Sequence, residues 1–233
     1  MASLADSVSV LAERVRPVAL ARERVLPVAL PLADLLPGRG LVRGSTVEVV
    51  GSAATSLALA LAVEASQCGS WVAAAGLSCL GLAAAERLGL SLERLVAVPE
   101  LGQQQWPTVV ATLVEGFDVV LAGPPGALKL ADARRLVARL RERGATLILV
   151  GWPAGRWGER PDLTLQVAEA HWEGIGQGWG HLAARRVVVS VSGRRGADRP
   201  VSAELWLPGV DGKLSACLPD NLVPLARYQA RSA

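Results

Sequence analysis

Between residues 46 and 151, short apolar runs alternate with longer segments whose apolar residues recur at helical spacing. The apolar runs predict strands over residues 46–50, 70–77, 94–100, 117–124 and 145–151. The amphipathic segments predict helices over residues 56–67, 80–90, 106–116 and 130–144. In the last of these, Leu136 and Leu140 share a face that the arginines avoid. Continuous apolar strands separated by helices are typical of a parallel sheet covered on both faces.

The pattern changes after Gly151, where apolar and polar residues alternate one by one. This alternation predicts strands with one exposed face over residues 162–174, 184–196 and 200–209. Gly-rich turns separate these strands, which favours antiparallel pairing. We therefore expect an α/β fold with a mostly parallel sheet flanked by helices and antiparallel strands at its C-terminal side.

The two ends of the chain differ from this central region. A near-repeat, VRPVAL and then VLPVAL, occupies residues 15–20 and 25–30, and Pro17 and Pro27 forbid a continuous helix there. We therefore expect a helix and extended arm over residues 1–31, a core domain over residues 32–210 and a tail over residues 211–233.

Composition excludes several classes of protein. The chain has 233 residues, of which 51% are hydrophobic, so it can bury a sizeable core. Its net charge of +3 is too small to indicate nucleic-acid binding by bulk charge. Three cysteines without metal-ligand spacing (Cys68, Cys79 and Cys217) are expected to be buried thiols of a reducing cytoplasm. No metal or cofactor is expected.

Two features bear on the membrane. The N-terminus carries Asp6 and Glu13 and lacks the apolar region of a signal peptide, so none is expected. Residues 65–85 carry no charge, but the window is rich in Ala, Gly and Ser. A buried strand between two helices explains it better than a membrane span does, because a span needs about 20 predominantly apolar residues.

Residues 47–66 have the outline of a phosphate-binding loop, since a strand, a turn led by Gly51 and then Thr55-Ser56 open a helix. In the full motif, a lysine stands six residues after the first glycine and reaches the outer phosphates. Here Ser52, Ala53 and Ala54 are the only residues between Gly51 and the hydroxyl pair. The turn is about three residues short and lacks both the second glycine and the lysine of the motif. It cannot wrap a triphosphate in the usual way.

Two further requirements of nucleotide hydrolysis are missing. The strand over residues 117–124 ends at Ala122, where a magnesium-binding acid is expected, and Asp118 stands at the other end. No carboxylate follows the strand over residues 70–77 to activate water. These residues predict a degenerate site that does not turn over nucleotide.

Residues 32–207 resemble the RecA ATPase core element by element, from LPGRGLVRGSTVEVVG through AAERLGLSLERLVAVPE to FDVVLAGPPGAL. The resemblance implies a RecA-like core with a mostly parallel sheet. The chain departs from that family at Ala54, at Leu77-Ser78, at Ala122 and in a shortened loop after residue 150.

A RecA-like chain of this length with degenerate nucleotide motifs, rich in Ala and Arg, is similar to the ImuA and ImuA-prime proteins of actinobacteria. That resemblance implies a non-catalytic, damage-inducible accessory protein of the mutasome. It further implies a partner of the ImuB type, an inactive Y-family polymerase relative that docks on the sliding clamp. An error-prone C-family polymerase then performs mutagenic translesion synthesis. The implied location is the cytoplasm, in association with the nucleoid.

Two segments are candidate partner-binding sites. Trp152, Arg156, Trp157 and Arg160 interleave in the loop after residue 150, where RecA contacts single-stranded DNA. Three readings stay open for this loop: tryptophans that cap the core, a protein interface, or stacking on single-stranded DNA. Leu222, Leu225 and Tyr228 in the Pro-containing tail suit an added peptide segment.

The remaining basic and aromatic clusters have simpler interpretations. Residues 171–181 predict a hairpin loop, and residues 193–200 predict a solvated turn. The arginines of the helix over residues 130–144 predict a solvated face rather than a DNA tract.

Two other functions remain open. One is a working RecA-class ATPase or a recombination modulator that binds single-stranded DNA, in which Thr55 and Ser56 would matter. The other is a regulator of cell division of the SulA type, which has a trimmed RecA-like fold.

Overall fold

The computed structural model describes residues 25–153, 156–175, 180–194, 197 and 200–217. Residues 1–24 of the expected arm lie outside the described residues, as do the tail residues Leu222, Leu225 and Tyr228. The second copy of the near-repeat is described. It forms the short strand β1 (Val25–Pro27) and the start of α2 (Leu30–Ala33).

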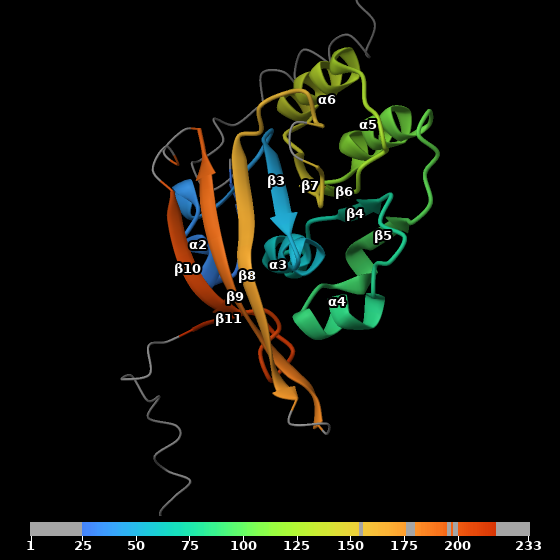
Figure 1. The fold of residues 1–233 in the computed structure, drawn as a ribbon. Coiled ribbons are helices and arrows are strands. Elements are labelled where there is room, and N and C mark those ends of the chain that lie inside the picture. The colour runs from blue at the N-terminus through green and yellow to red at the C-terminus, as the bar shows by residue number, and fades with distance from the viewer. Residues whose placement is uncertain (1–24, 154–155, 176–179, 195–196, 198–199, 218–233) are drawn as a thin grey trace, which may run out of the picture.

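A nine-stranded sheet organises the fold, in the spatial order β11-β10-β9-β8-β3-β7-β6-β4-β5 (Figure 1). Its parallel part comprises β3 (Thr46–Gly51), β4 (Val72–Ala75), β5 (Leu95–Val98), β6 (Val119–Ala122), β7 (Thr146–Val150) and β8 (Leu163–Ile175). The antiparallel extension comprises β9 (Gly180–Gly193), β10 (Val201–Trp206) and β11 (Ser215–Ala216). The predicted α/β class, with antiparallel strands at its C-terminal side, is confirmed.

Strand β8 joins the two parts of the sheet. Along one edge it runs parallel to β3, with Val47 opposite Leu163 and Gly51 opposite Val167. Along its other edge it pairs antiparallel with β9, with register shifts after Val167 and Glu173. Its local alternation predicted an antiparallel strand, and the parallel pairing with β3 is an addition to that prediction.

Helices cover both faces of the parallel part (Figure 1). α3 (Ala54–Gln67) and α4 (Leu82–Leu88) pack on one face, and α5 (Trp106–Gly116) and α6 (Leu130–Arg143) pack on the other. The described residues also form two short 3-10 turns, η2 (Pro37–Arg39) and η3 (Leu92–Arg94). α3 is buried over most of its surface, as is typical of a helix that is apolar nearly all round.

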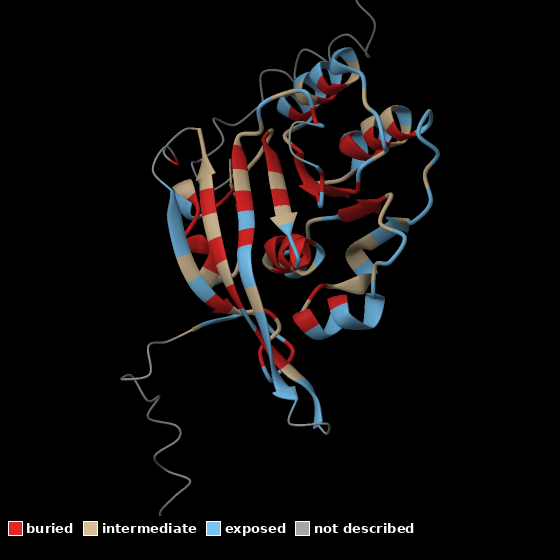
Figure 2. Cartoon of the chain, in the orientation of Figure 1, coloured by how far each residue is buried: buried red, intermediate tan, exposed pale blue. Residues whose placement is uncertain are grey.

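The core has two parts separated by the sheet, and buried residues alternate with less buried ones along the first half of β8 and the second half of β9 (Figure 2). The larger part lies on the α3 face and continues under β9 and β10. There a small hairpin of β1 with β2 (Gly40–Val42) covers it through Leu26 and Leu41. The end of the predicted arm is thus part of the core.

Two expectations about residues 65–85 have different outcomes. This uncharged window forms the end of α3, strand β4 and the start of α4, and none of the described helices has the length and apolar character to cross a membrane. The expected burial of cysteines is wrong for Cys68 and Cys79, which are exposed free thiols. Cys68 lies at the exposed end of α3 and Cys79 lies in the turn before α4.

Candidate functional site

The turn between β3 and α3 is too short for a phosphate-binding loop. Gly51 ends β3 with a φ of 106°, and α3 already begins at Ala54. A Cβ on Gly51 would collide with the carbonyl group of Val167 in β8. The strand is therefore paired to its last residue, and only Ser52 and Ala53 form the connection.

The side chains of this turn provide little for a nucleotide. Ser52 and Thr55 are exposed, Ser56 is half-buried, and Ala53 at the N-cap forms no side-chain cap. The remaining attraction for an anion is that of a helix N-terminus, about 0.3–1 kcal/mol when exposed. The geometry leaves a hydroxyl pair at a helix start without the lysine or the loop that would bring phosphate to it.

The carboxyl end of β6, where the magnesium-binding acid would stand, is closed by two indoles. Ala122 is fully buried, and its carbonyl oxygen accepts a hydrogen bond from Trp152 Nε1 at 2.9 Å. The carbonyl oxygen of Gly123 accepts one from Trp106 Nε1 at 2.9 Å. Trp106 is a residue that sequence reasoning missed. Pro107 after it predicted only the start of a helix.

Asp118 lies at the opposite end of β6 and has a structural role. Its Oδ1 is 2.8 Å from Arg43 Nη1, and its Oδ2 accepts a hydrogen bond from the backbone N–H of Trp71 at 3.0 Å. The carboxylate thus ties the segment before β3 to the segment before β4. The interpretation that Asp118 stands at the wrong end of the strand for metal binding agrees with this position.

The crevice at the carboxyl ends of β4 and β6 is the usual ligand position in such sheets, because the connections diverge there to opposite faces. A cavity of about 560 Å³ lies at this point. Ser78, Glu100 and Trp106 are among the residues that line it. Glu100 follows β5 and is a carboxylate that the sequence analysis did not single out. The lining holds no basic residue that would bind phosphate.

The tryptophans of the loop after β7 are buried. Trp152 and Trp157 are 3% and 2% exposed, and Trp152 lies edge-on between Trp106 and Trp157 with both ring centroids 5.5 Å away. Of the three readings of this loop, capping of the core is therefore the one that describes both rings. Trp157 Nε1 is buried without an acceptor among the described residues.

The arginines of the same loop differ from the tryptophans. The side chains of Arg156 and Arg160 are exposed. The prediction placed all four residues on one partner-binding surface. The two tryptophans do not lie on such a surface, because their rings pack on each other and the indole N–H of Trp152 bonds to Ala122 in the core. The two arginines still lie on the surface.

Three arginines of α6 are held in surface ion pairs, as the expectation of a solvated face suggested. Arg134 pairs with Glu159 at 2.8 Å, Arg139 with Glu115 at 2.9 Å and Arg135 with Asp132 at 3.5 Å. In the predicted solvated turn, Arg194 bonds to the carbonyl oxygen of Arg160 and to Asp162. Arg195 and Arg199 lie outside the described residues.

The predicted hairpin loop is the far end of the β8–β9 hairpin, although residues 176–179 lie outside the described part. Arg185 lies over the ring of Trp172 at 4.9 Å and donates Nε–H to the carbonyl oxygen of Leu207 at 2.7 Å. Burial lowers the pKa of this guanidinium from its ordinary value. These contacts fix the hairpin to the segment that follows β10.

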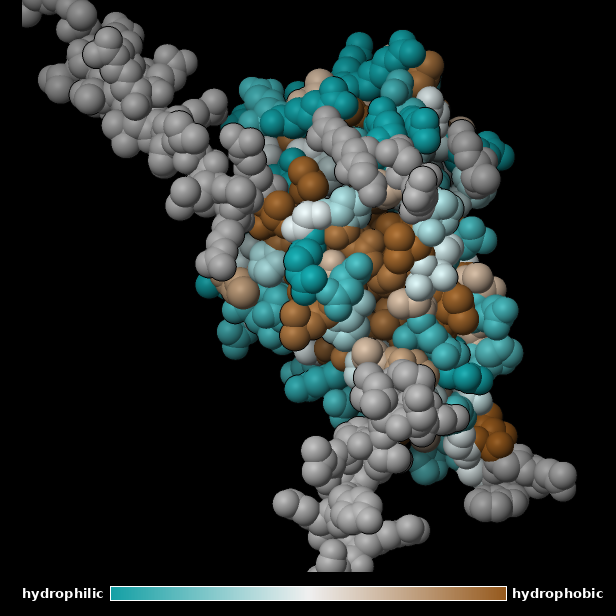
Figure 3. Space-filling model, turned by 90° about the vertical axis from the view of Figure 1, so that its left-hand side faces the viewer, coloured by the Kyte–Doolittle hydropathy of each residue, from teal (hydrophilic) through white to brown (hydrophobic). Residues whose placement is uncertain are grey.

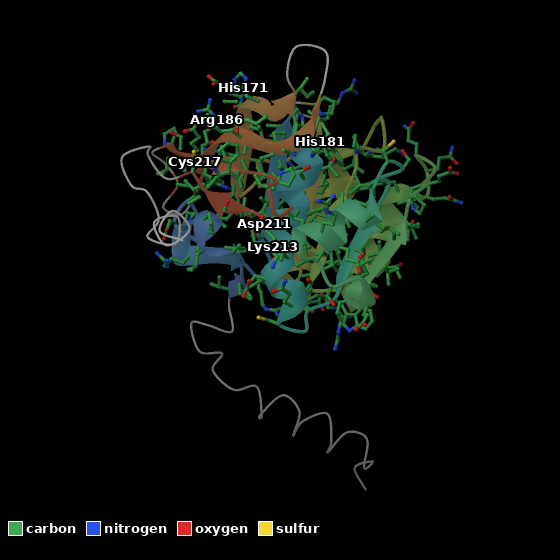
Figure 4. The ribbon with its side chains drawn as sticks, turned by 90° about the horizontal axis from the view of Figure 1, so that it is seen from below. His171, His181, Arg186, Asp211, Lys213 and Cys217 are labelled. Atoms are coloured by element: carbon green, nitrogen blue, oxygen red, sulfur yellow. The ribbon has the colours of Figure 1, made fainter. Side chains whose placement is uncertain are left out.

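The two histidines lie on this hairpin without a ligand set. His171 on β8 is opposite Arg186 on β9, and Figure 4 labels both, with Asp211 and Lys213 on the segment between β10 and β11. Over the described ranges, no group of three potential ligands is placed to hold a metal ion.

One exposed apolar area lies away from the nucleotide-site position. Figure 3 views the side formed by α2 and β10 and shows apolar side chains gathered at its centre between hydrophilic margins. Leu30 of α2 and Val201 of β10 are 73% and 48% exposed. Exposed apolar area of this kind is typical of an interaction surface.

Comparison with known proteins finds a matching family model and a curated relative. Residues 34–154, slightly more than half of the chain, match the family model described as the MT3502 N-terminal domain. A protein of Mycobacterium tuberculosis (strain H37Rv) described as uncharacterized protein Rv3395c is 36% identical over 118 residues. That match covers 50% of this chain and 57% of the relative, so the chain spans little more than half of the relative's length.

The fold also matches a solved structure. The crystal structure of the RadB recombinase superposes with a TM-score of 0.58 at 15% sequence identity. The match covers 81% of this chain and 97% of the RadB chain. At this identity the likeness shows the fold alone, and that fold is RecA-like.

Proposed function

The chain belongs to the MT3502 N-terminal domain family and has a RecA-like fold, and we propose that it is a scaffold that does not turn over nucleotide. Its role in this proposal is to bind an ImuB-type, inactive Y-family polymerase relative. That relative connects it to the sliding clamp and to an error-prone C-family polymerase during translesion synthesis. The proposed location is the cytoplasm, close to the nucleoid.

The closed end of β6 is the observation that carries the proposal. Ala122 stands where a magnesium-binding acid would be, and its carbonyl oxygen accepts a hydrogen bond from the indole N–H of Trp152. A nucleotide site needs a metal ligand at this strand end, and the buried alanine provides none. The tryptophans packed at this strand end support a role in binding a partner rather than in catalysis.

The tight β3–α3 turn supports the same proposal independently. A functional loop needs several backbone N–H groups directed at one anion, and this needs more residues than Ser52 and Ala53 provide. Because Gly51 is paired with Val167, the turn cannot gain length by releasing the end of β3 without breaking sheet pairing.

The first experiment measures nucleotide binding and turnover by the purified full-length chain. We expect no magnesium-dependent ATP binding by calorimetry, and an ATPase rate that Thr55→Ala leaves unchanged. Hydrolysis that disappears in Thr55→Ala would contradict the proposal and favour a RecA-class ATPase.

The second experiment identifies the partner by affinity purification from DNA-damaged cells, followed by mass spectrometry. We expect the Y-family polymerase relative to co-purify, and to bind again when both proteins are pure. Recovery of the division protein FtsZ in its place would favour a SulA-like regulator. Direct, tight binding to single-stranded DNA alone would favour a recombination modulator.

A further inference from the structure

A small pocket lies on the surface between the β6–α6 connection and the segment that follows β7. Its volume is about 200 Å³. The residues that shape it are Pro124, Pro125, Leu128, Trp152, Pro153 and Arg156. It is distinct from the cavity beside Glu100, from which Pro124 separates it.

The walls of the pocket are apolar and poor in hydrogen-bond donors. Pro124, Pro125 and Pro153 have no backbone N–H. The indole N–H of Trp152 is already bonded to the carbonyl oxygen of Ala122. Among the side chains that line the pocket, Arg156 is the one with a charged donor, so a phosphate group would find a single cation beside apolar walls. An apolar side chain would find aliphatic contacts from the prolines and Leu128.

The size of the pocket fits one side chain rather than a whole ligand. Sites for drug-sized molecules usually measure about 300–1,000 Å³, and an apolar cavity of about 150 Å³ can hold a benzene ring. A pocket of about 200 Å³ is thus suited to one residue such as Leu or Phe, as anchor pockets in protein interfaces are.

The rim of the pocket carries positive charge that the described residues do not neutralise. Arg156 is exposed, and its side chain forms no ion pair within the described part of the chain. Nearby Arg134 differs, because Glu159 pairs with it. An anionic group beside the anchoring side chain would complement this rim.

We propose that this pocket binds a segment of the partner protein in which an apolar side chain is flanked by a carboxylate. The apolar side chain enters between the prolines and Trp152, and the carboxylate pairs with Arg156. This inference rests on the proposed scaffold function and names the surface that performs it.

Single-stranded DNA is a poorer occupant of the same place. Bases bind such surfaces by stacking on exposed aromatic faces. Here the rings of Trp152 and Trp157 are 3% and 2% exposed and pack on each other, so no aromatic face is offered. The apolar walls favour a peptide.

The test uses purified full-length chain and a purified ImuB-type partner from the same genome, with binding followed by biolayer interferometry. Arg156→Glu reverses the charge at the rim. Arg160→Glu makes the same change on an exposed side chain of the same loop that does not line the pocket, and is the matched control. Pro153→Glu places a carboxylate on an exposed part of the apolar wall.

We expect Arg156→Glu and Pro153→Glu each to weaken partner binding roughly tenfold, and Arg160→Glu less than about threefold. Circular dichroism should show unchanged melting for Arg156→Glu and Arg160→Glu, because both side chains are exposed. Equal weakening by the two arginine reversals would overturn the proposal, since it would indicate general electrostatic attraction.

Other outcomes separate this inference from the function on which it rests. If the wild-type chain binds the partner and neither pocket variant weakens it, the pocket is wrong and the scaffold function stands. If the wild-type chain does not bind the partner, both fail. Binding of a fluorescein-labelled oligothymidine that Arg156→Glu removes would assign the pocket to DNA instead. Self-association lost in Arg156→Glu, measured by sedimentation, would assign it to a second copy of the chain.

Discussion

The indole N–H of Trp152 donates a hydrogen bond of 2.9 Å to the carbonyl oxygen of Ala122, the last residue of β6. This bond joins the loop after β7 to the strand end where a RecA-type site would hold its metal. Trp106 makes the equivalent bond to the next carbonyl, of Gly123. The two bonds make the tryptophans part of the sheet's carboxyl edge, so their substitution has consequences for folding.

Trp157 is 2% exposed and packs edge-on against Trp152, so Trp157→Ala should lower the free energy of unfolding by about 3–5 kcal/mol, as truncation of a buried aromatic residue does. Urea titration followed by circular dichroism measures this change. Arg156→Ala, at an exposed neighbouring position, should alter stability by less than about 0.5 kcal/mol. A nearly unchanged melting temperature for Trp157→Ala, together with lost partner binding, would show that the ring is an interface residue and not a core residue.

Gly51→Ala should be strongly destabilising because the new Cβ meets the carbonyl group of Val167. Gly69→Ala is a matched control, since Gly69 also has a positive φ, 96°, but has open space around it. The left-handed conformation alone costs about 1–2 kcal/mol in both. Chemical denaturation should show Gly51→Ala to be clearly the worse of the two. Equal effects would mean that the β3–α3 turn has room to move.

Asp118→Asn should lower stability by about 1–2 kcal/mol, because it weakens the pair with Arg43 and the acceptor for the Trp71 N–H. A double-mutant cycle with Arg43→Met separates the two contributions. Coupling near zero would indicate that the backbone contact to Trp71, and not the ion pair, is the stabilising part.

Glu48 predicts a pH dependence of stability. It lies half-buried in the middle of β3, and burial raises the pKa of its carboxyl group above the ordinary 4.5, opposed by a hydrogen bond from Thr164. The folded state therefore binds this proton more tightly than the unfolded chain. Its stabilising contribution is complete below pH 4.5 and is lost as the pH rises through the raised pKa.

Replacement of Glu48 by Gln tests the direction of this pH dependence of stability. Glu48→Gln should be more stable than the wild type at pH 7, and the difference should shrink as the pH falls towards 4.5. Denaturation curves at several pH values give the comparison. A variant that is less stable than the wild type at pH 7 would show that the ionised carboxylate makes a favourable contact.

Truncation after Leu218 should weaken binding to the ImuB-type partner, since it removes Leu222, Leu225 and Tyr228. The cut leaves every described element in place, so the melting temperature should stay close to that of the full chain. An unchanged pull-down with the truncated chain would remove the tail from the interface.

The order of strands and helices could be predicted because each depends on local spacing of apolar residues. The losses at Ala54 and Ala122 could also be predicted, since motif positions are fixed along the chain. The parallel pairing of β8 with β3 could not, because a strand's own alternation does not say which neighbour it meets. Residues 25–31 were likewise expected to end an extended arm, and the pairing of residues 25–27 with residues 40–42 forms between separated segments.

For the candidate site, only the missing residues of the nucleotide motifs could be predicted from the sequence. Residues 151–161 combine Gly, Pro and Arg with tryptophan, a composition typical of an exposed loop. Burial of Trp152 depends on Trp106 and on the end of β6, which the sheet brings together from separate parts of the chain. The pocket beside Arg156 has the same origin, since its walls come from two connections that no sequence pattern relates.

Pairing of Gly51 with Val167 also limits how this lineage can change. Point substitutions that introduce lysine and glycine into the turn would supply the charge of an ATPase loop without its length. A nucleotide site of that kind would also need inserted residues in the turn, an acid in place of Ala122 and removal of the indole bonded to its carbonyl oxygen. Under the proposed scaffold function, nucleotide turnover could therefore arise only through several changes made together.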